Sequence, residues 1–122
     1  MLQFILSRIK SFAYAFKGIR TLFATQPNAW IHLLAAALVS VLGVWLQLSF
    51  IEWAILALTI GTVIAAEAFN TALEFLTDLV SPDYHPLAGK TKDVAAAGVL
   101  ITALAAIGVG VFIFLPKILA LF

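Results

Sequence analysis

The 122-residue chain is 64% hydrophobic and only 11% charged, whereas a soluble domain averages roughly 45–50% apolar and about 25% charged residues. Because so short a chain has too little interior to bury this apolar surplus, the surplus must face lipid or other subunits, which argues against a soluble enzyme or a disordered chain. The net charge of +1 gives no strong field for binding nucleic acid, and the absence of cysteine excludes disulfides and thiolate metal sites.

Residues 1–27 are predicted to form a basic amphipathic helix. Apolar side chains recur there at spacings of three and four, which places them on one helix face. They are Ile5, Ile9, Phe12, Phe16, Ile19 and Phe23. The cations Arg8, Lys10, Lys17 and Arg20 are spread through the segment, so a cleavable signal peptide is not expected. Such a helix suits the membrane surface, and the alternative is a helix packed in a protein core.

Three apolar stretches follow, and transmembrane helices are predicted over residues 31–51, 53–80 and 94–115. At 1.5 Å per residue, a helix of about 22 residues spans about 33 Å, enough for a bilayer core of about 30 Å. Pro116 is expected to stop the last helix. The predicted fold class is therefore an all-α membrane protein. It forms a single domain over residues 1–122, with an N-terminal amphipathic surface helix and three transmembrane helices.

The positions of lysine and arginine predict the orientation. Four cations precede the first span, Lys90 and Lys92 lie between the second and third spans, and none lies between the first and second. The positive-inside rule places the N-terminus and the second link in the cytoplasm, and three spans then leave the C-terminus outside. The expected location is the inner (cytoplasmic) membrane of a bacterium.

Polar residues interrupt the apolar pattern after Ala66. Glu67, Asn70, Glu74 and Asp78 are spaced by three, four and four residues, so they form one stripe on a helix. A carboxylate costs about 2.5–3.5 kcal/mol at the centre of a membrane helix, so several on one face imply a partner: a divalent cation, a basic residue or water. Alternatively, the acids mark the end of a helix that emerges into water. That alternative fits Asp78 best and Glu67 least.

Residues 81–93 are predicted to form a loop, because they include Pro82, Pro86 and Gly89. This loop brings further polar side chains to the membrane surface beside the acid stripe. They are Asp83, His85, Lys90, Lys92 and Asp93. So many different polar groups together, in a chain with few charges, indicate a functional site.

Four motifs carry a more specific signal: YAFKGIR at residues 14–20, NAWIH at 28–32, EAFNTALE at 67–74 and DYHPLAGKTKD at 83–93. In order and spacing they resemble the bacterial integral-membrane diacylglycerol kinase family, which includes the undecaprenol kinases. The resemblance implies transfer of the ATP γ-phosphoryl group to a membrane-lipid hydroxyl with the help of Mg²⁺. It also implies a homotrimer whose active sites are shared between subunits.

The resemblance implies a role for each matching residue. Glu67 would be the general base for the lipid hydroxyl, Asn70 would orient the reacting groups, and Glu74 would bind Mg²⁺. Nucleotide-contacting positions fall on Tyr14, Gln26, Glu74, Asp83, Tyr84, His85, Lys92 and Asp93, with Arg8 one step out of register. Lipid-contacting positions fall on Arg20, Trp45 and Glu67. These residue types suit phosphoryl transfer, which needs positioning, cations and a base near the nucleophile.

The chain departs from the family pattern at three positions. Gln26 stands where the diacylglycerol branch has a second magnesium-binding glutamate, and glutamine offers an oxygen without the charge. Ser7 stands where a nucleotide-binding arginine is expected, and Asp83 replaces a more familiar glutamate. The motif at residues 28–32 and residues 85–88 resemble the undecaprenol kinase branch more closely. Undecaprenol is therefore the predicted acceptor, and diacylglycerol is the alternative.

Two functions of other classes are also considered. In a membrane scaffold, the acids of the stripe would pair with Lys90 and Lys92 across subunits. In a cation or proton pathway, the acid stripe would carry cations or protons through the membrane. The pathway is the less favoured, because the ionisable residues cluster at one end and the third span contains none.

Overall fold

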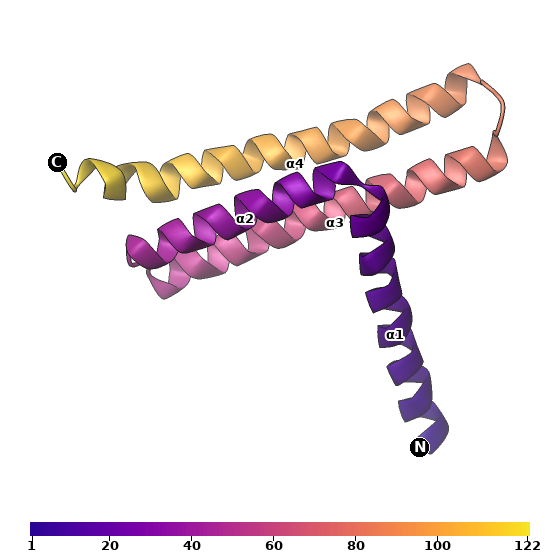
Figure 1. Cartoon of the computed structure of the whole chain (residues 1–122), viewed down its shortest axis with the longest axis horizontal. Helices are drawn as coiled ribbons and strands as arrows, with labels where there is room; N and C mark the ends of the chain where they lie inside the picture. Colours follow the sequence, from indigo (N-terminus) through magenta and orange to yellow (C-terminus); the bar gives the residue numbers. More distant parts are fainter.

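The computed structural model describes all 122 residues and contains four α-helices and no strand. The helices are α1 (Leu2–Thr25), α2 (Pro27–Trp45), α3 (Phe50–Val80) and α4 (Pro86–Leu119). Figure 1 shows α2, α3 and α4 running along the long axis of the molecule, while α1 leaves them at a steep angle. The three aligned helices are each long and apolar enough to cross a membrane. The predicted all-α membrane fold is confirmed.

Helices α3 and α4 are longer than a bilayer core is thick. Their 31 and 34 residues span about 46 and 51 Å, against a hydrocarbon thickness of about 30 Å. Helix α2 is shorter, at 19 residues, and it begins where α1 leaves the bundle. The end of α3 and the first turns of α4 therefore extend past α2, toward the short link that joins them (Figure 1).

The corner between α1 and α2 is fixed by local chemistry. Gln26 has an extended backbone (φ −116°, ψ 103°), because the proline that follows it disfavours the helical region. Pro27 then starts α2, where a missing N–H costs nothing. The Trp30 indole N–H donates to the Phe23 carbonyl at 2.7 Å, and the two rings pack edge to face. These contacts define the direction in which α1 leaves.

Apart from Phe23 at its end, the apolar face of α1 has no partner within the chain. Ile9, Phe12 and Phe16 are each more than half exposed, and only 11 of the 122 residues are buried anywhere in the protein. The alternative of a helix packed in a protein core is therefore wrong for the single chain. An exposed face of this kind is suited to lipid or to another subunit.

The turn between α2 and α3 closes the opposite end of the bundle. Gln47 adopts a left-handed backbone (φ 53°), and the Leu48 N–H donates to the Gly43 carbonyl at 3.0 Å, as in a Schellman motif. The Ser49 side chain accepts from the Glu52 N–H, while the Glu52 carboxylate accepts from the Ser49 N–H, which forms a capping box at the start of α3. The predicted span over residues 31–51 ran past the true end of α2, because the apolar turn carries no charge to mark it.

Gly43 permits this tight turn. A β-carbon at this position would lie 2.8 Å from Leu48 Cδ1 and 3.0 Å from the Trp53 ring. We expect Gly43→Ala to lower the free energy of unfolding by about 1–3 kcal/mol, the usual cost of overpacking. Gly61→Ala on α3 is the matched control, since a β-carbon there meets nothing within 4 Å. Thermal unfolding in detergent measures both, and equal midpoints for the two variants would contradict the packing argument.

Two boundary predictions for the last helix are wrong. Helix α4 begins at Pro86 rather than at residue 94, because His85 caps it: the Leu87 N–H donates to His85 Nδ1 at 3.1 Å. Only residues 81–85 form the link, so Gly89, Lys90 and Lys92 are helical. Pro116 does not stop α4, which continues to Leu119. A proline removes only one helical hydrogen bond, and the next turn is held by Ala120 N–H donating to the Pro116 carbonyl.

Candidate active site

Glu74 lies at the centre of a polar cluster where α1, α2 and α3 meet. Gln26, at the corner, donates its Nε2 amide to Glu74 Oε2 at 3.2 Å. Asn70, one turn earlier on α3, donates Nδ2 to Glu74 Oε1 at 3.1 Å. Two amides thus hold both oxygens of this carboxylate. The sequence-predicted residues Gln26, Asn70 and Glu74 are brought together.

Glu67 is the most deeply buried acid, with only 2% of the residue exposed. Its Oε1 atom lies 3.1 Å from His32 Nε2 on α2 but accepts no well-aligned hydrogen bond. The neighbouring Asn70 Oδ1 is also buried without a partner. Buried polar atoms are normally hydrogen-bonded, so these two oxygens mark a place where a ligand or water completes the structure.

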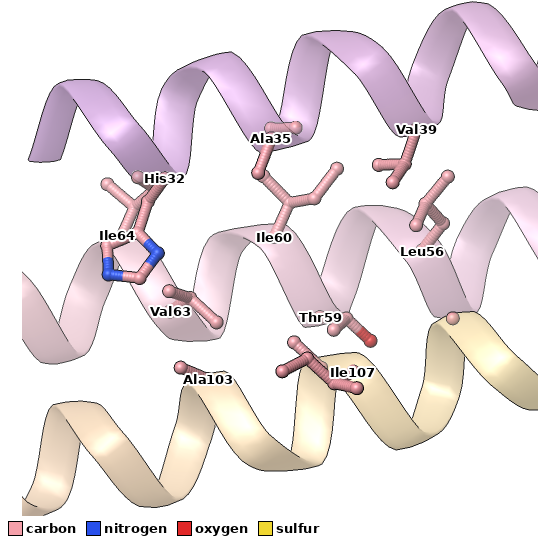
Figure 2. Close-up of a pocket in the computed structure, with 13 residues that line it drawn as sticks. His32, Ala35, Val39, Leu56, Thr59, Ile60, Val63, Ile64, Ala103 and Ile107 are labelled. Carbon is pink, nitrogen blue, oxygen red and sulfur yellow. The ribbon is translucent and has the colours of Figure 1, made fainter.

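Two hollows meet at His32. The first, about 260 Å³, is lined by Asn28, His32, Glu67 and Asn70 and, on α4, by small or apolar residues. The second is an apolar cleft of about 330 Å³ that runs between α2, α3 and α4. Figure 2 shows His32 at one end of this cleft, with Val39 and Leu56 toward the other. A polar chamber is therefore joined to an apolar one at the imidazole.

The remaining acid of the stripe has a basic partner. Asp78 forms an ion pair with Lys92 on the second turn of α4, across the link between the helices. Lys90 and Thr91, beside Lys92, line a third cleft of about 680 Å³ together with Asn70. The three acids thus have three different neighbours: a histidine for Glu67, amides for Glu74 and a lysine for Asp78.

The other predicted site residues are scattered over the surface of the single chain. Three of them are exposed on α1, which points away from the α3–α4 link (Figure 1): Tyr14, Arg8 and Arg20. Four others are exposed in the link and the start of α4: Asp83, Tyr84, His85 and Asp93. Of these, His85 serves as the helix cap. Trp45 ends α2, about 20 Å along the helix from His32. One copy of the chain therefore does not gather the predicted nucleotide positions into one site.

His32 is the residue that the sequence did not identify as part of the site. It was visible only as a family motif position and as the single ionisable group in the first span. Its contact with Glu67 joins residues on two different helices, and no spacing rule predicts such a contact. A histidine inside an otherwise uncharged span was the available signal.

A match to a protein-family model identifies the family of proteins that shares this arrangement. Residues 13–114 match the model for prokaryotic diacylglycerol kinase. The chain belongs to this family. Among curated relatives, it is 41% identical over 109 residues to the undecaprenol kinase of Bacillus subtilis, covering 89% of each chain. It is 45% identical over 112 residues to a diacylglycerol kinase of Synechocystis, covering 91% of this chain and 64% of that one. It is 30% identical over 99 residues to the diacylglycerol kinase of Escherichia coli K12, covering 81% of each.

Membership of this family makes the chain a membrane-embedded lipid kinase that uses ATP. The scaffold and cation-pathway hypotheses are therefore wrong. The matched region includes the Gln26–Glu74 cluster, Glu67 and His32, together with the α3–α4 link.

Proposed function

We propose that this lipid kinase transfers the γ-phosphoryl group of ATP to undecaprenol, with Mg²⁺, and that Glu67 is the general base. The observation that carries the proposal is the position of Glu67. It is buried in the wall of the polar chamber, beside the histidine at which that chamber meets the apolar cleft, so a lipid hydroxyl can meet a carboxylate there. Both the NAWIH motif and the similarity to the B. subtilis undecaprenol kinase favour undecaprenol.

In the proposed reaction, the lipid hydroxyl enters the polar chamber while its apolar chain stays in the cleft and the surrounding lipid. The O–H bond breaks as its proton moves to the Glu67 carboxylate, and the lipid oxygen forms a bond to the γ-phosphorus. The bond from the γ-phosphorus to the bridging oxygen breaks, and its electron pair leaves with ADP. Asn70 lies one turn from Glu67 and donates to Glu74, so it is placed to hold the acceptor and phosphoryl groups in line.

The polar cluster suits Mg²⁺ bound together with a nucleotide. Magnesium prefers oxygen ligands and commonly takes one or two carboxylates plus phosphates and water. Glu74 supplies one carboxylate, and no group of three or more acidic, histidine or cysteine side chains could hold a metal alone. Gln26 can contribute its Oε1 once the amide turns, because in the present hydrogen bond it offers nitrogen to Glu74. When bound, the ion would neutralise charge on the transferring phosphoryl group.

The proposed orientation places the site at the cytoplasmic face of the bacterial inner membrane. Six of the seven lysines and arginines lie on α1 or on the first two turns of α4, at the end of the bundle that carries Glu74. The seventh, Lys117, lies at the opposite end and pairs with Glu52 at 3.1 Å. This asymmetry follows the positive-inside rule. ATP would then reach the site from the cytoplasm.

We also propose that the enzyme works as a homotrimer with composite sites. The α1 positions Tyr14 and Arg8 are far from the α3–α4 link within one chain, whereas a second copy could supply one set to the other. The many exposed large apolar side chains leave ample surface for contacts between copies. Native mass spectrometry from nanodiscs counts the copies directly. A single copy per active particle would overturn the proposal of composite sites.

The acceptor can be tested with purified enzyme, labelled ATP and Mg²⁺ in micelles that contain equal amounts of undecaprenol and diacylglycerol. We expect label on undecaprenol at least about tenfold above that on diacylglycerol, a difference of roughly 1.4 kcal/mol in transition-state binding. Preference for diacylglycerol would overturn the acceptor assignment and leave the kinase assignment standing. Label on neither lipid, with a folded enzyme, would contradict both acceptors.

A further inference from the structure

His32 is the only basic residue within ion-pair distance of Glu67. The three ion pairs of the chain join His32 to Glu67, Lys92 to Asp78 and Lys117 to Glu52. No lysine or arginine of α1 forms an ion pair with Glu67, and α4 presents only Ala96, Val99, Leu100 and Ala103 to the shared chamber. On α3 itself, Asn70 directs its amide toward Glu74. The imidazole is thus the one basic group on any packed helix that contacts this buried carboxylate.

Because Glu67 is buried, its contact with His32 has a large effect on the carboxylate. A carboxylate removed from water is strongly disfavoured unless it is paired or hydrogen-bonded, and the usual outcome without a partner is protonation. The Glu67 carboxylate therefore needs a hydrogen-bond donor, and the Nε2 atom of His32, at 3.1 Å, is the basic group in place to act as one.

The position of His32 is well defined by packing. Ala29, one turn earlier on α2, is completely buried, which brings the start of α2 close to its neighbours. The imidazole itself is 23% exposed by its side chain, in contrast to the 2% of Glu67, so the ring separates the buried carboxylate from the more open side. It also lines both the polar chamber and the apolar cleft. Figure 2 shows the ring beside Ile64 at the end of the cleft.

We propose that His32 is a positioning residue for Glu67. Donation from Nε2–H holds the Glu67 carboxylate turned into the chamber shared with Asn70, ready for the lipid hydroxyl. The present contact lacks good alignment, as is common for catalytic hydrogen bonds before substrate binds. This inference rests on the proposed role of Glu67 as the base. It adds that the base is active only because a second helix supplies its partner.

The test compares His32→Leu, which keeps the bulk of the side chain, with His32→Gln, which keeps an N–H donor. Ser40→Ala on the same helix is the control, since Ser40 bonds only to the Ala36 carbonyl of its own helix. We expect His32→Leu to lower kcat by about 10- to 100-fold, a part of the roughly 10²–10⁴-fold that a general base contributes. KM for ATP should change by less than about twofold, because the Gln26–Glu74 cluster is untouched. His32→Gln should recover part of the lost kcat.

A second readout does not depend on turnover. Infrared difference spectra of folded protein should show a shifted carboxyl band in His32→Leu, because Glu67 loses its hydrogen-bond donor, and this shift should vanish when Glu67→Gln is added. In kinetics, the double variant should be no slower than Glu67→Gln alone, since both substitutions remove the same function. A wild-type kcat in His32→Leu, or a folded His32→Leu with an unshifted carboxyl band, would overturn the proposal. If His32→Leu does not fold, His32→Gln must show an intermediate kcat and a smaller band shift, and wild-type values for both would also overturn it. Loss of activity in Glu67→Gln tests the base itself, so the two proposals fail separately.

Discussion

Replacing Glu67 with glutamine is expected to reduce phosphoryl transfer by about 10²–10⁴-fold, the range contributed by a positioned general base. The substitution keeps the size and shape of a side chain that is 2% exposed, so packing against α2 and α4 should persist. An amide cannot accept the hydroxyl proton. Labelled-ATP turnover measures the loss, while assembly and nucleotide binding are checked in the same preparation and should stay close to wild type.

Glu52→Gln is the matched control for this experiment. It makes the same chemical change on the same helix, but at the far end of α3, where Glu52 caps the helix and pairs with Lys117. This variant should lose some stability and keep its kcat. If Glu67→Gln turned over lipid as fast as Glu52→Gln, the assignment of Glu67 as the base would be wrong.

Replacing Glu74 with glutamine is expected to raise the Mg²⁺ concentration needed for half-maximal activity by about 10- to 100-fold, in line with the loss of a group that holds a metal site together. Glu74 is the single carboxylate of its cluster, and its two oxygens are already held by Gln26 and Asn70. A neutral amide keeps the shape and removes the charge that attracts the cation. Activity measured over a magnesium titration at fixed ATP gives the shift.

Gln26→Glu provides the opposite change at the same cluster. It adds a second carboxylate 3.2 Å from Glu74, where the present pair is an amide and an acid. Magnesium would then be bound by two carboxylates, so half-maximal activity should require less of it. An unchanged magnesium dependence in Glu74→Gln would remove Glu74 from the metal site, whatever the behaviour of the Gln26 variant.

The fold class was predictable because membrane insertion places simple demands on sequence. A helix must be long enough and apolar enough to span, and the stretches around residues 31–51, 53–80 and 94–115 meet both conditions without reference to one another. The residues at which the helices begin and end were harder to predict. The Schellman turn at Gln47 and the His85 cap depend on single hydrogen bonds that leave no trace in hydropathy. As a result, α2 ends earlier and α4 begins earlier than expected.

The acid stripe was also predictable, because Glu67, Asn70 and Glu74 share a face through helical spacing alone. The partners of that stripe were not. Spacing suggested a cation, a basic residue or water for all the acids, whereas the structure gives Glu67, Glu74 and Asp78 different neighbours. Two of these neighbours come from other helices, and the third comes from the corner before α2.

The amino-acid sequence is enough to predict a bundle of membrane helices with a line of acids at its cationic end. Periodicity and composition are local properties, and they decide which face of a helix is polar and which helix enters lipid. The packing of the helices, in contrast, is needed to see that His32 contacts Glu67, that Gln26 contacts Glu74, and that an apolar cleft ends at that histidine. Those contacts depend on the crossing of separate helices and on a corner set by Pro27, and the spacing of residues along one helix does not encode either.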